Sequence, residues 1–168
     1  MKIKARKPLR MREYDYSLPG TYFITICTAE KKKILSKIVG AYHDAPVQIK
    51  LSDYGEIVKE AIERLPCRFN INIHNYVIMP DHIHILLEIN ACDRALHEAP
   101  LQERSIISQS IGYLKAYVTK EIRKNHPEEK LWQSRFYDHV IRNDKDYIKH
   151  YDYIKDNPVM WALGKHII

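Results

Sequence analysis

Apolar and polar residues alternate most regularly near the middle of the chain. Isoleucine or leucine occupies every second position there, in the order His82-Ile83-His84-Ile85-Leu86-Leu87-Glu88-Ile89. Successive side chains of a β-strand point to opposite faces of a sheet. We therefore predict a strand over residues 82–89 whose odd-numbered side chains face a hydrophobic core. The same strand would project His82 and His84 together from its opposite face.

Similar patterns predict the other strands. We expect strands over residues 22–27, 47–51 and 70–79, with residues 132–141 forming a mixture of strand and loop. Pro80 and Asp81 form a tight turn that joins the third of these strands to the strand of His82. Residues 91–100 have the composition of a loop. Two long strands joined by a tight turn indicate antiparallel pairing.

Helical spacing of apolar residues predicts three helices. The first begins at Ser52 or Asp53 and runs to about Leu65, and the second runs from about Ser105 to Lys124. The third begins with Asp144 as its cap and should stop near Asn157. Proline cannot continue a helix, so Pro66 and Pro158 are expected to end the first and third helices.

The order of these elements predicts an α+β fold. We expect a ferredoxin-like, or RRM-like, antiparallel sheet with helices packed on one face, plus the C-terminal helix. The 168 residues suit a single domain over positions 1–168 with a full core. Its basic N-terminus, about residues 1–15, would form an arm that contacts a phosphate backbone or remains a solvated tail.

Composition narrows the class of partner. The net charge of +6 fits a polyanion such as nucleic acid, and it fits an ordinary basic protein equally well. Three cysteines, Cys27, Cys67 and Cys92, lack CxxC spacing and indicate reduced thiols in the cytoplasm. No apolar run approaches the roughly 18 residues of a membrane span, so we expect no membrane partner.

The histidine pair is the first candidate for chemistry. His82 and His84 on one strand face are close enough to hold one metal ion. Two imidazoles are not a complete site, so a third ligand would come from another element. The alternative interpretation is a pair of solvent-facing histidines, and the pair alone does not identify a reaction.

The C-terminal helix is the second candidate. One helical stripe has the character of core packing, and it contains Tyr147, Tyr151 and Ile154. A different face carries Tyr153 and Asn157, together with Asp146 and His150. Tyr153 and Asn157 are four residues apart and therefore stack on adjacent turns. An amide oxygen is a suitable hard ligand and a phenol is a nucleophile.

Four segments resemble a known family. The segment 80–87, Pro-Asp-His-Ile-His-Ile-Leu-Leu, resembles the HUH motif of single-tyrosine HUH transposases. Segments 20–28, 132–142 and 153–159 resemble the REP-associated tyrosine transposase branch of the IS200-like family. Together these matches span roughly residues 10 to 160.

The resemblance implies a function and a set of site residues. His82, His84 and Asn157 match the ligands of a divalent metal, Mg²⁺ or Mn²⁺, and Tyr153 matches the nucleophile. Such an enzyme cleaves and rejoins single-stranded DNA near hairpins through a covalent 5′-phosphotyrosine during DNA transposition. It would act as a monomer or a homodimer.

Residues just before the last helix combine an aromatic ring with basic groups, as is usual for single-strand binding. We expect the DNA-binding residues to be Arg12, Trp132, Arg135, His139 and Arg142. Burial of Trp132 in the core is an equal alternative. Two other functions remain open: a hairpin-binding protein that has lost catalysis, and a replication initiator or relaxase. The last of these often has a second tyrosine, a role open to Tyr147 or Tyr151.

Overall fold

The computed structural model describes residues 19–40, 46–91 and 105–165. Arg12, the basic arm of residues 1–15 and nearly all of the predicted loop of residues 91–100 lie outside these ranges. Strands β1 and β4–β6 form a four-stranded antiparallel sheet in the order β4-β5-β1-β6. Their bounds are Gly20–Cys27 for β1, Ile71–Ile78 for β4, His82–Ile89 for β5 and Tyr137–Val140 for β6.

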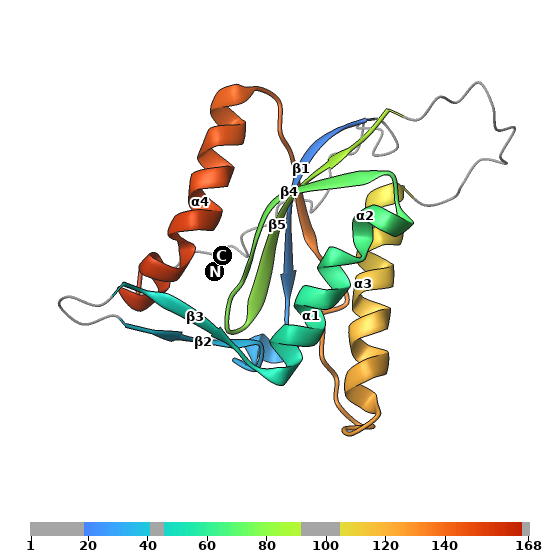
Figure 1. Cartoon of the computed structure of the whole chain (residues 1–168), viewed down its shortest axis with the longest axis vertical. Helices are drawn as coiled ribbons and strands as arrows, with labels where there is room; N and C mark the ends of the chain where they lie inside the picture. Colours follow the sequence, from blue (N-terminus) through green and yellow to red (C-terminus); the bar gives the residue numbers. More distant parts are fainter. Residues whose placement is uncertain (1–18, 41–45, 92–104, 166–168) are drawn as a thin grey trace, which may run out of the picture.

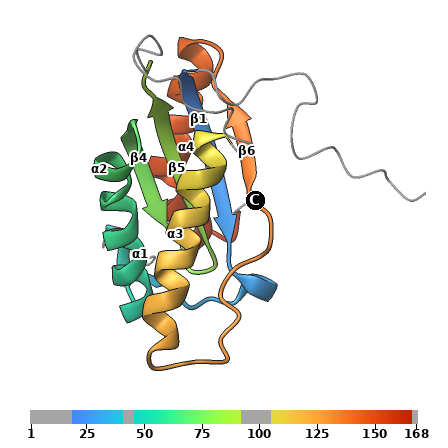
Figure 2. The same cartoon turned by 90° about the vertical axis from the view of Figure 1, so that its right-hand side faces the viewer.

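Helices cover both faces of this sheet (Figures 1 and 2). Helices α1 (Asp53–Glu63) and α3 (Ile106–Arg123) pack on one face, and α4 (Asp144–Ala162) packs on the other. The larger core lies between the sheet and the pair α1 and α3. It contains all four odd-numbered residues of β5, Ile83, Ile85, Leu87 and Ile89. The predicted α+β fold and the orientation of β5 are thereby confirmed.

A smaller apolar cluster lies between the sheet and α4. Its buried members are Phe23, Val77, Met79, Leu86 and Ile154. Leu86 belongs to the same face of β5 as the two histidines. The C-terminal helix therefore closes over the strand face that carries the candidate ligands, while α1 and α3 fill the other face.

Short elements complete the fold. Strands β2 (Ser36–Val39) and β3 (Gln48–Leu51) form a separate two-stranded sheet, and β2 was not predicted. A 3₁₀ turn, η1, spans Ala29–Lys31, and a short helix, α2, spans Leu65–Arg68. None of the helices in the described ranges combines the length and the apolarity needed to cross a membrane.

The predicted ends of α4 are wrong at both termini. Asn143, rather than Asp144, caps the helix, because its side chain accepts a hydrogen bond from the backbone N–H of Asp146 at 3.0 Å. Pro158 lies inside α4, which continues to Ala162. A proline removes one backbone hydrogen bond, and the turn beyond it still packs Trp161 against the smaller cluster.

Candidate active site

His82 and His84 lie side by side beneath α4. The exposed fractions of their side chains are near zero, and their ring centroids are 4.6 Å apart. The alternative of a solvent-facing pair is therefore wrong. Burial, followed by the nearby positive groups of His82, Lys31 and His150, holds the pKa of His84 well below its ordinary value. The imidazole of His84 is thus neutral near pH 7, which is the form that binds metal.

Hydrogen bonds fix the orientation of both imidazoles. Nδ1 of His82 lies 2.6 Å from Oδ1 of Asp81, and Nδ1 of His84 lies 2.9 Å from Oγ1 of Thr25. Thr25 reaches His84 because the two residues are direct partners in the β1–β5 pairing. A ligating histidine commonly donates its other N–H to such a partner. Both supporting bonds use Nδ1 and leave Nε2 available.

Three buried atoms at this site lack hydrogen-bond partners within the described ranges. They are Nε2 of His82, Nε2 of His84 and Oδ1 of Asn157. An unsatisfied buried polar atom costs about 1–3 kcal/mol, so three together indicate a missing ligand. Two imidazole nitrogens and an amide oxygen are suitable donors for a divalent cation. The residues present therefore fit a metal site formed by β5 and α4.

Tyr153 lies next to these atoms. Its ring centroid is 5.2 Å from that of His84 and 5.8 Å from that of Phe23. Burial raises the pKa of the Tyr153 phenol, and a side-chain hydrogen bond with Asn157 opposes that rise. The phenol is therefore protonated at neutral pH and needs assistance to act as a nucleophile. The structure places Tyr153 and Asn157 on one face of α4, as the sequence predicts.

The two other tyrosines of α4 differ in burial: Tyr147 packs as predicted and Tyr151 does not. Tyr151 projects from α4 toward solvent and is 39% exposed. Its predicted place in the core is therefore wrong. Tyr147 is half-buried against the smaller cluster, and its hydroxyl forms a hydrogen bond with Nδ1 of His74 at 3.0 Å. Within the described part of the chain, the rings of Tyr147 and Tyr151 stack on each other and contact neither His82 nor His84.

A second group of ligand-type side chains joins β6 to α4. Nε2 of His139 lies 2.9 Å from Oδ2 of Asp146, and Nδ1 of His150 lies 3.2 Å from Oδ1 of the same carboxylate. The potential ligand atoms all lie within 4.8 Å of one another. These atoms already bond to one another, whereas Nε2 of His82 and Nε2 of His84 have no partner in the part of the chain that the structure describes. The latter pair is therefore the better candidate for a metal.

The predicted DNA-binding residues are spread over different environments. Trp132 is 8% exposed and packs in the larger core, so its ring is not available for stacking. His139 bonds to Asp146, while the side chains of Arg135 and Arg142 are exposed. A contact of Arg135 or Arg142 with DNA stays a prediction.

Asp81 and Thr25 are two residues of the candidate site that were not predicted from the sequence. Asp81 directly precedes His82, so its position in the turn was a usable signal for a supporting carboxylate. Thr25 had no such signal, because its contact with His84 depends on the register between β1 and β5. The β6–α4 contact of His139 with Asp146 likewise requires the tertiary structure.

Comparison with known proteins places the chain in a family. The family model described as IS200-like transposase matches residues 20–157, and the chain belongs to this family. The matched range includes His82, His84, Tyr153 and Asn157. The family resemblance inferred from the sequence motifs is confirmed, and it identifies the chain as a member of a family of DNA-processing enzymes.

Individual relatives cover nearly the whole chain. An uncharacterized protein of Haemophilus influenzae is 36% identical over 95% of this chain and 91% of its own length. A REP-associated tyrosine transposase of Escherichia coli is 25% identical over 94% of this chain and 78% of its own length. The solved structure of a REP-associated tyrosine transposase bound to a REP hairpin has the same fold, with a TM-score of 0.61 and 24% identity. That structural match covers 90% of this chain and 74% of the other.

Proposed function

We propose that this chain is a metal-dependent endonuclease and strand transferase for single-stranded DNA, with Tyr153 as its nucleophile. The observation that carries the proposal is the set of three buried, unpartnered ligand atoms next to Tyr153. His82, His84 and Asn157 would hold Mg²⁺ or Mn²⁺. When bound, the cation supplies positive charge that offsets the charge of a scissile phosphate.

The side chains of the site have distinct roles in this proposal. Asp81 and Thr25 orient the two imidazoles through their Nδ1 atoms. Tyr153 Oη attacks the phosphorus atom, forming a phosphotyrosine bond while the bond from phosphorus to the 3′ oxygen breaks. The phenolic proton is lost and the departing 3′ oxygen gains a proton. The covalent intermediate conserves the energy of the broken bond, so a 3′ hydroxyl can reverse the step and join a new end.

Hairpin DNA is the proposed substrate. The net charge of +6 favours a polyanion, and a structure of the same fold is described as bound to a REP hairpin. The proposal treats residues 1–168 as one domain that acts in the cytoplasm as a monomer or homodimer. Arg135 and Arg142, which are exposed just before α4, would contact the DNA backbone.

The test uses single-stranded hairpin oligonucleotides from the flanks of the gene. Incubation with Mg²⁺ or Mn²⁺, followed by a denaturing gel, should reveal a covalent protein–DNA adduct. Peptide mass spectrometry should place the 5′ phosphate on Tyr153. Hairpin binding without an adduct under these conditions would favour the second candidate, a hairpin-binding protein that has lost catalysis.

The replication initiator or relaxase is the third candidate. It would use a second tyrosine on α4, and Tyr151 is exposed enough to reach DNA. An adduct divided between Tyr153 and Tyr151 would favour it, whereas an adduct on Tyr153 alone supports a single-tyrosine enzyme.

A further inference from the structure

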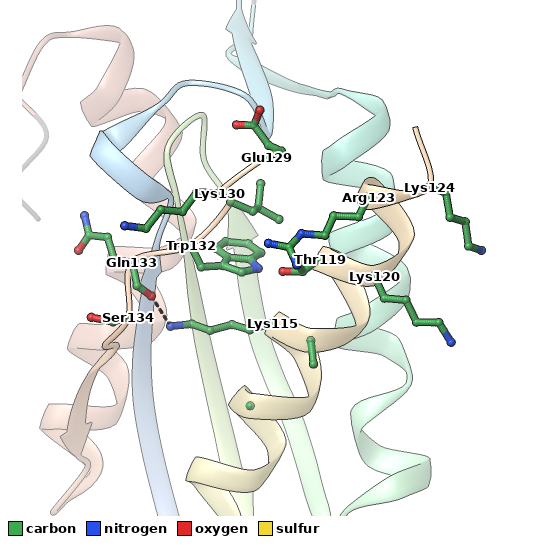
Figure 3. A pocket seen from close by; sticks show the side chains of 13 residues that line it. Lys115, Thr119, Lys120, Arg123, Lys124, Glu129, Lys130, Trp132, Gln133 and Ser134 are labelled. Atoms are coloured by element: carbon green, nitrogen blue, oxygen red, sulfur yellow. Dashed lines mark hydrogen bonds between the residues drawn. The ribbon is translucent and has the colours of Figure 1, made fainter. Parts of the chain in front are cut away.

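A basic groove lies on the side of the sheet away from α4. It runs between α3 and the segment 129–134, and it encloses about 950 Å³ (Figure 3). Its lining includes one carboxylate, that of Glu129, and five cationic side chains. The cationic residues are Lys115, Lys120, Arg123, Lys124 and Lys130. Glu129 already pairs with Lys32 at 3.1 Å. The groove therefore carries a net positive charge.

The cations of this groove differ in how they are used. Lys115 donates to the backbone carbonyls of Gln133 and Arg135, which ties α3 to the segment before β6. Lys124 pairs with Glu121. Lys120, Arg123 and Lys130 are exposed and have no ion-pair partner among the described residues. Figure 3 shows Arg123 and Lys130 on opposite sides of the Trp132 ring. Three cations thus remain available for an anionic ligand.

Trp132 provides an independent indication of a ligand. This residue lines the groove and is only 8% exposed, and its buried indole Nε1 has no hydrogen-bond partner among the described residues. An indole N–H is only a donor, and leaving it unpaired in a buried position is costly. A phosphate or sugar oxygen in the groove would supply an acceptor, while the surrounding cations would offset the charge of a phosphate.

A short chain of contacts links the groove to the candidate metal ligands on the other face of the sheet. Trp132 pairs with Thr28, whose backbone N–H and hydroxyl both donate to the carbonyl of Asp81, at 2.9 and 3.0 Å. Asp81 in turn holds His82. Thr28 therefore joins Trp132 to Asp81, the residue that directly precedes the candidate metal ligand His82. Lys31, in the adjacent η1 turn, adds a further cation there.

We propose that this groove binds the sugar–phosphate backbone of the single-stranded DNA that continues beyond the hairpin from the cleavage site. The identity of the ligand as DNA rests on the proposed function. Cations and an N–H donor recognise phosphate and sugar oxygens without reading bases, so the groove adds affinity for any flanking sequence. Arg135 and Arg142 are not among the residues that line the groove.

The test compares two oligonucleotides by fluorescence anisotropy at several salt concentrations. One is a hairpin that ends near the cleavage position, and the other is the same hairpin with a single-stranded extension of about 12 nucleotides, within the usual range of single-strand sites. A triple variant, Lys120→Gln, Arg123→Gln and Lys130→Gln, removes the available cations. The matched control, Lys37→Gln, Lys50→Gln and Lys59→Gln, removes the same charge from exposed lysines on β2, β3 and α1.

Wild-type protein should bind the extended hairpin more tightly than the short one, and the control variant should keep that preference. The groove variant should bind the short hairpin normally and lose the preference. Each phosphate contact on a single strand contributes about 0.7 to the slope of log K against log salt, so three lost contacts should flatten the slope for the extended hairpin by roughly 2.

Three outcomes would overturn the proposal: wild-type protein that gains nothing from the extension, a groove variant that keeps the preference, or an equal loss of affinity for both oligonucleotides. Adduct formation on the short hairpin is scored separately. Absence of an adduct would count against the proposed catalysis alone, because the comparison of binding does not depend on cleavage.

Discussion

The phenol ring of Tyr153 lies nearly edge-on to the imidazole of His84, with ring centroids 5.2 Å apart and planes inclined at 66°. The two residues belong to α4 and β5, on either side of the smaller apolar cluster. Phe23 of β1 contacts both, at 5.0 Å from His84 and 5.8 Å from Tyr153. This aromatic packing positions the candidate nucleophile beside the candidate metal ligands before any substrate binds.

Tyr153→Phe should form no covalent adduct with a hairpin oligonucleotide and should still bind it. The substitution removes the hydroxyl and keeps the ring that contacts Phe23 and His84, so the site retains its shape. A denaturing gel measures the adduct, and anisotropy measures the binding.

Two other tyrosines serve as controls for this substitution. On α3, the hydroxyl of Tyr117 donates a hydrogen bond to Glu60 of α1. On α4, Tyr151 projects into solvent. Tyr117→Phe and Tyr151→Phe should both keep adduct formation. A 5′ phosphate found on a tyrosine other than Tyr153 would refute the assignment.

His84→Ala should abolish the binding of Mn²⁺ to chelator-treated protein, measured by calorimetry, and should abolish cleavage. The substitution removes the packing of His84 against Phe23. It also removes a buried nitrogen that has no partner among the described residues, which offsets part of that loss, so the fold should remain. His74→Ala is the matched control, since His74 is a half-buried histidine of β4 that bonds to Tyr147 and Glu88. Normal Mn²⁺ binding by His84→Ala would exclude this site.

Asp81→Asn should weaken Mn²⁺ binding about 10–100-fold, the usual effect of losing a partner that supports a metal-ligating histidine. The carboxylate accepts from Nδ1 of His82 at 2.6 Å and thereby directs the lone pair of Nε2 toward the metal position. Titration of Mn²⁺ into both proteins measures the change. An unchanged dissociation constant would mean that Asp81 supports only the turn.

Alternation and helical spacing were sufficient to predict the architecture. The alternation in β5 identified which residues enter the larger core, since each face of that strand packs against a helical layer. Strand β2 (Ser36–Val39) was missed, although its partner β3, which is equally short, was predicted from the alternation over residues 47–51. The end of α4 was predicted too early, at Pro158, because packing of the turn that follows this proline outweighs the loss of one hydrogen bond.

The candidate site could be predicted only in part. His82, His84, Tyr153 and Asn157 are two pairs with short local spacing, so a motif can reveal each pair. The contacts of His84 with Thr25 and of His139 with Asp146 connect distant segments. Such contacts depend on strand register and on how α4 approaches β6, and a single sequence contains no local signal for either.

Arg135→Ala combined with Arg142→Ala should weaken hairpin binding and flatten its salt dependence. Both side chains are exposed on the segment that leads into α4, and each lost phosphate contact on a single strand lowers the slope by about 0.7. Anisotropy of a short hairpin between 50 and 200 mM salt, roughly the range in which such contacts dominate, measures the slope. A slope equal to that of the wild type would argue against phosphate contacts at these residues.

Asp146→Asn should destabilise the protein at neutral pH by about 1–3 kcal/mol, the range for losing charged hydrogen bonds. Burial tends to raise the pKa of this carboxyl. Hydrogen bonds from His139 and from the backbone N–H of Arg142 outweigh that effect and lower the pKa below its ordinary value. These bonds attach the first turn of α4 to β6.

The lowered pKa determines how this loss of stability should vary with pH. The folded state favours the ionised Asp146, so its contribution is present above the pKa of the unfolded chain, about 3.9. It disappears as the pH falls through the lower pKa of the folded state. Urea unfolding at several values between about pH 7 and about pH 3, a range that spans the unfolded pKa, should show the wild type and the variant converging only at the acidic end. Asp152→Asn, which alters an exposed carboxylate on the same helix, should match the wild type throughout. A difference between Asp146→Asn and the wild type that persists undiminished at pH 3 would show that charge is not the source of the stabilisation.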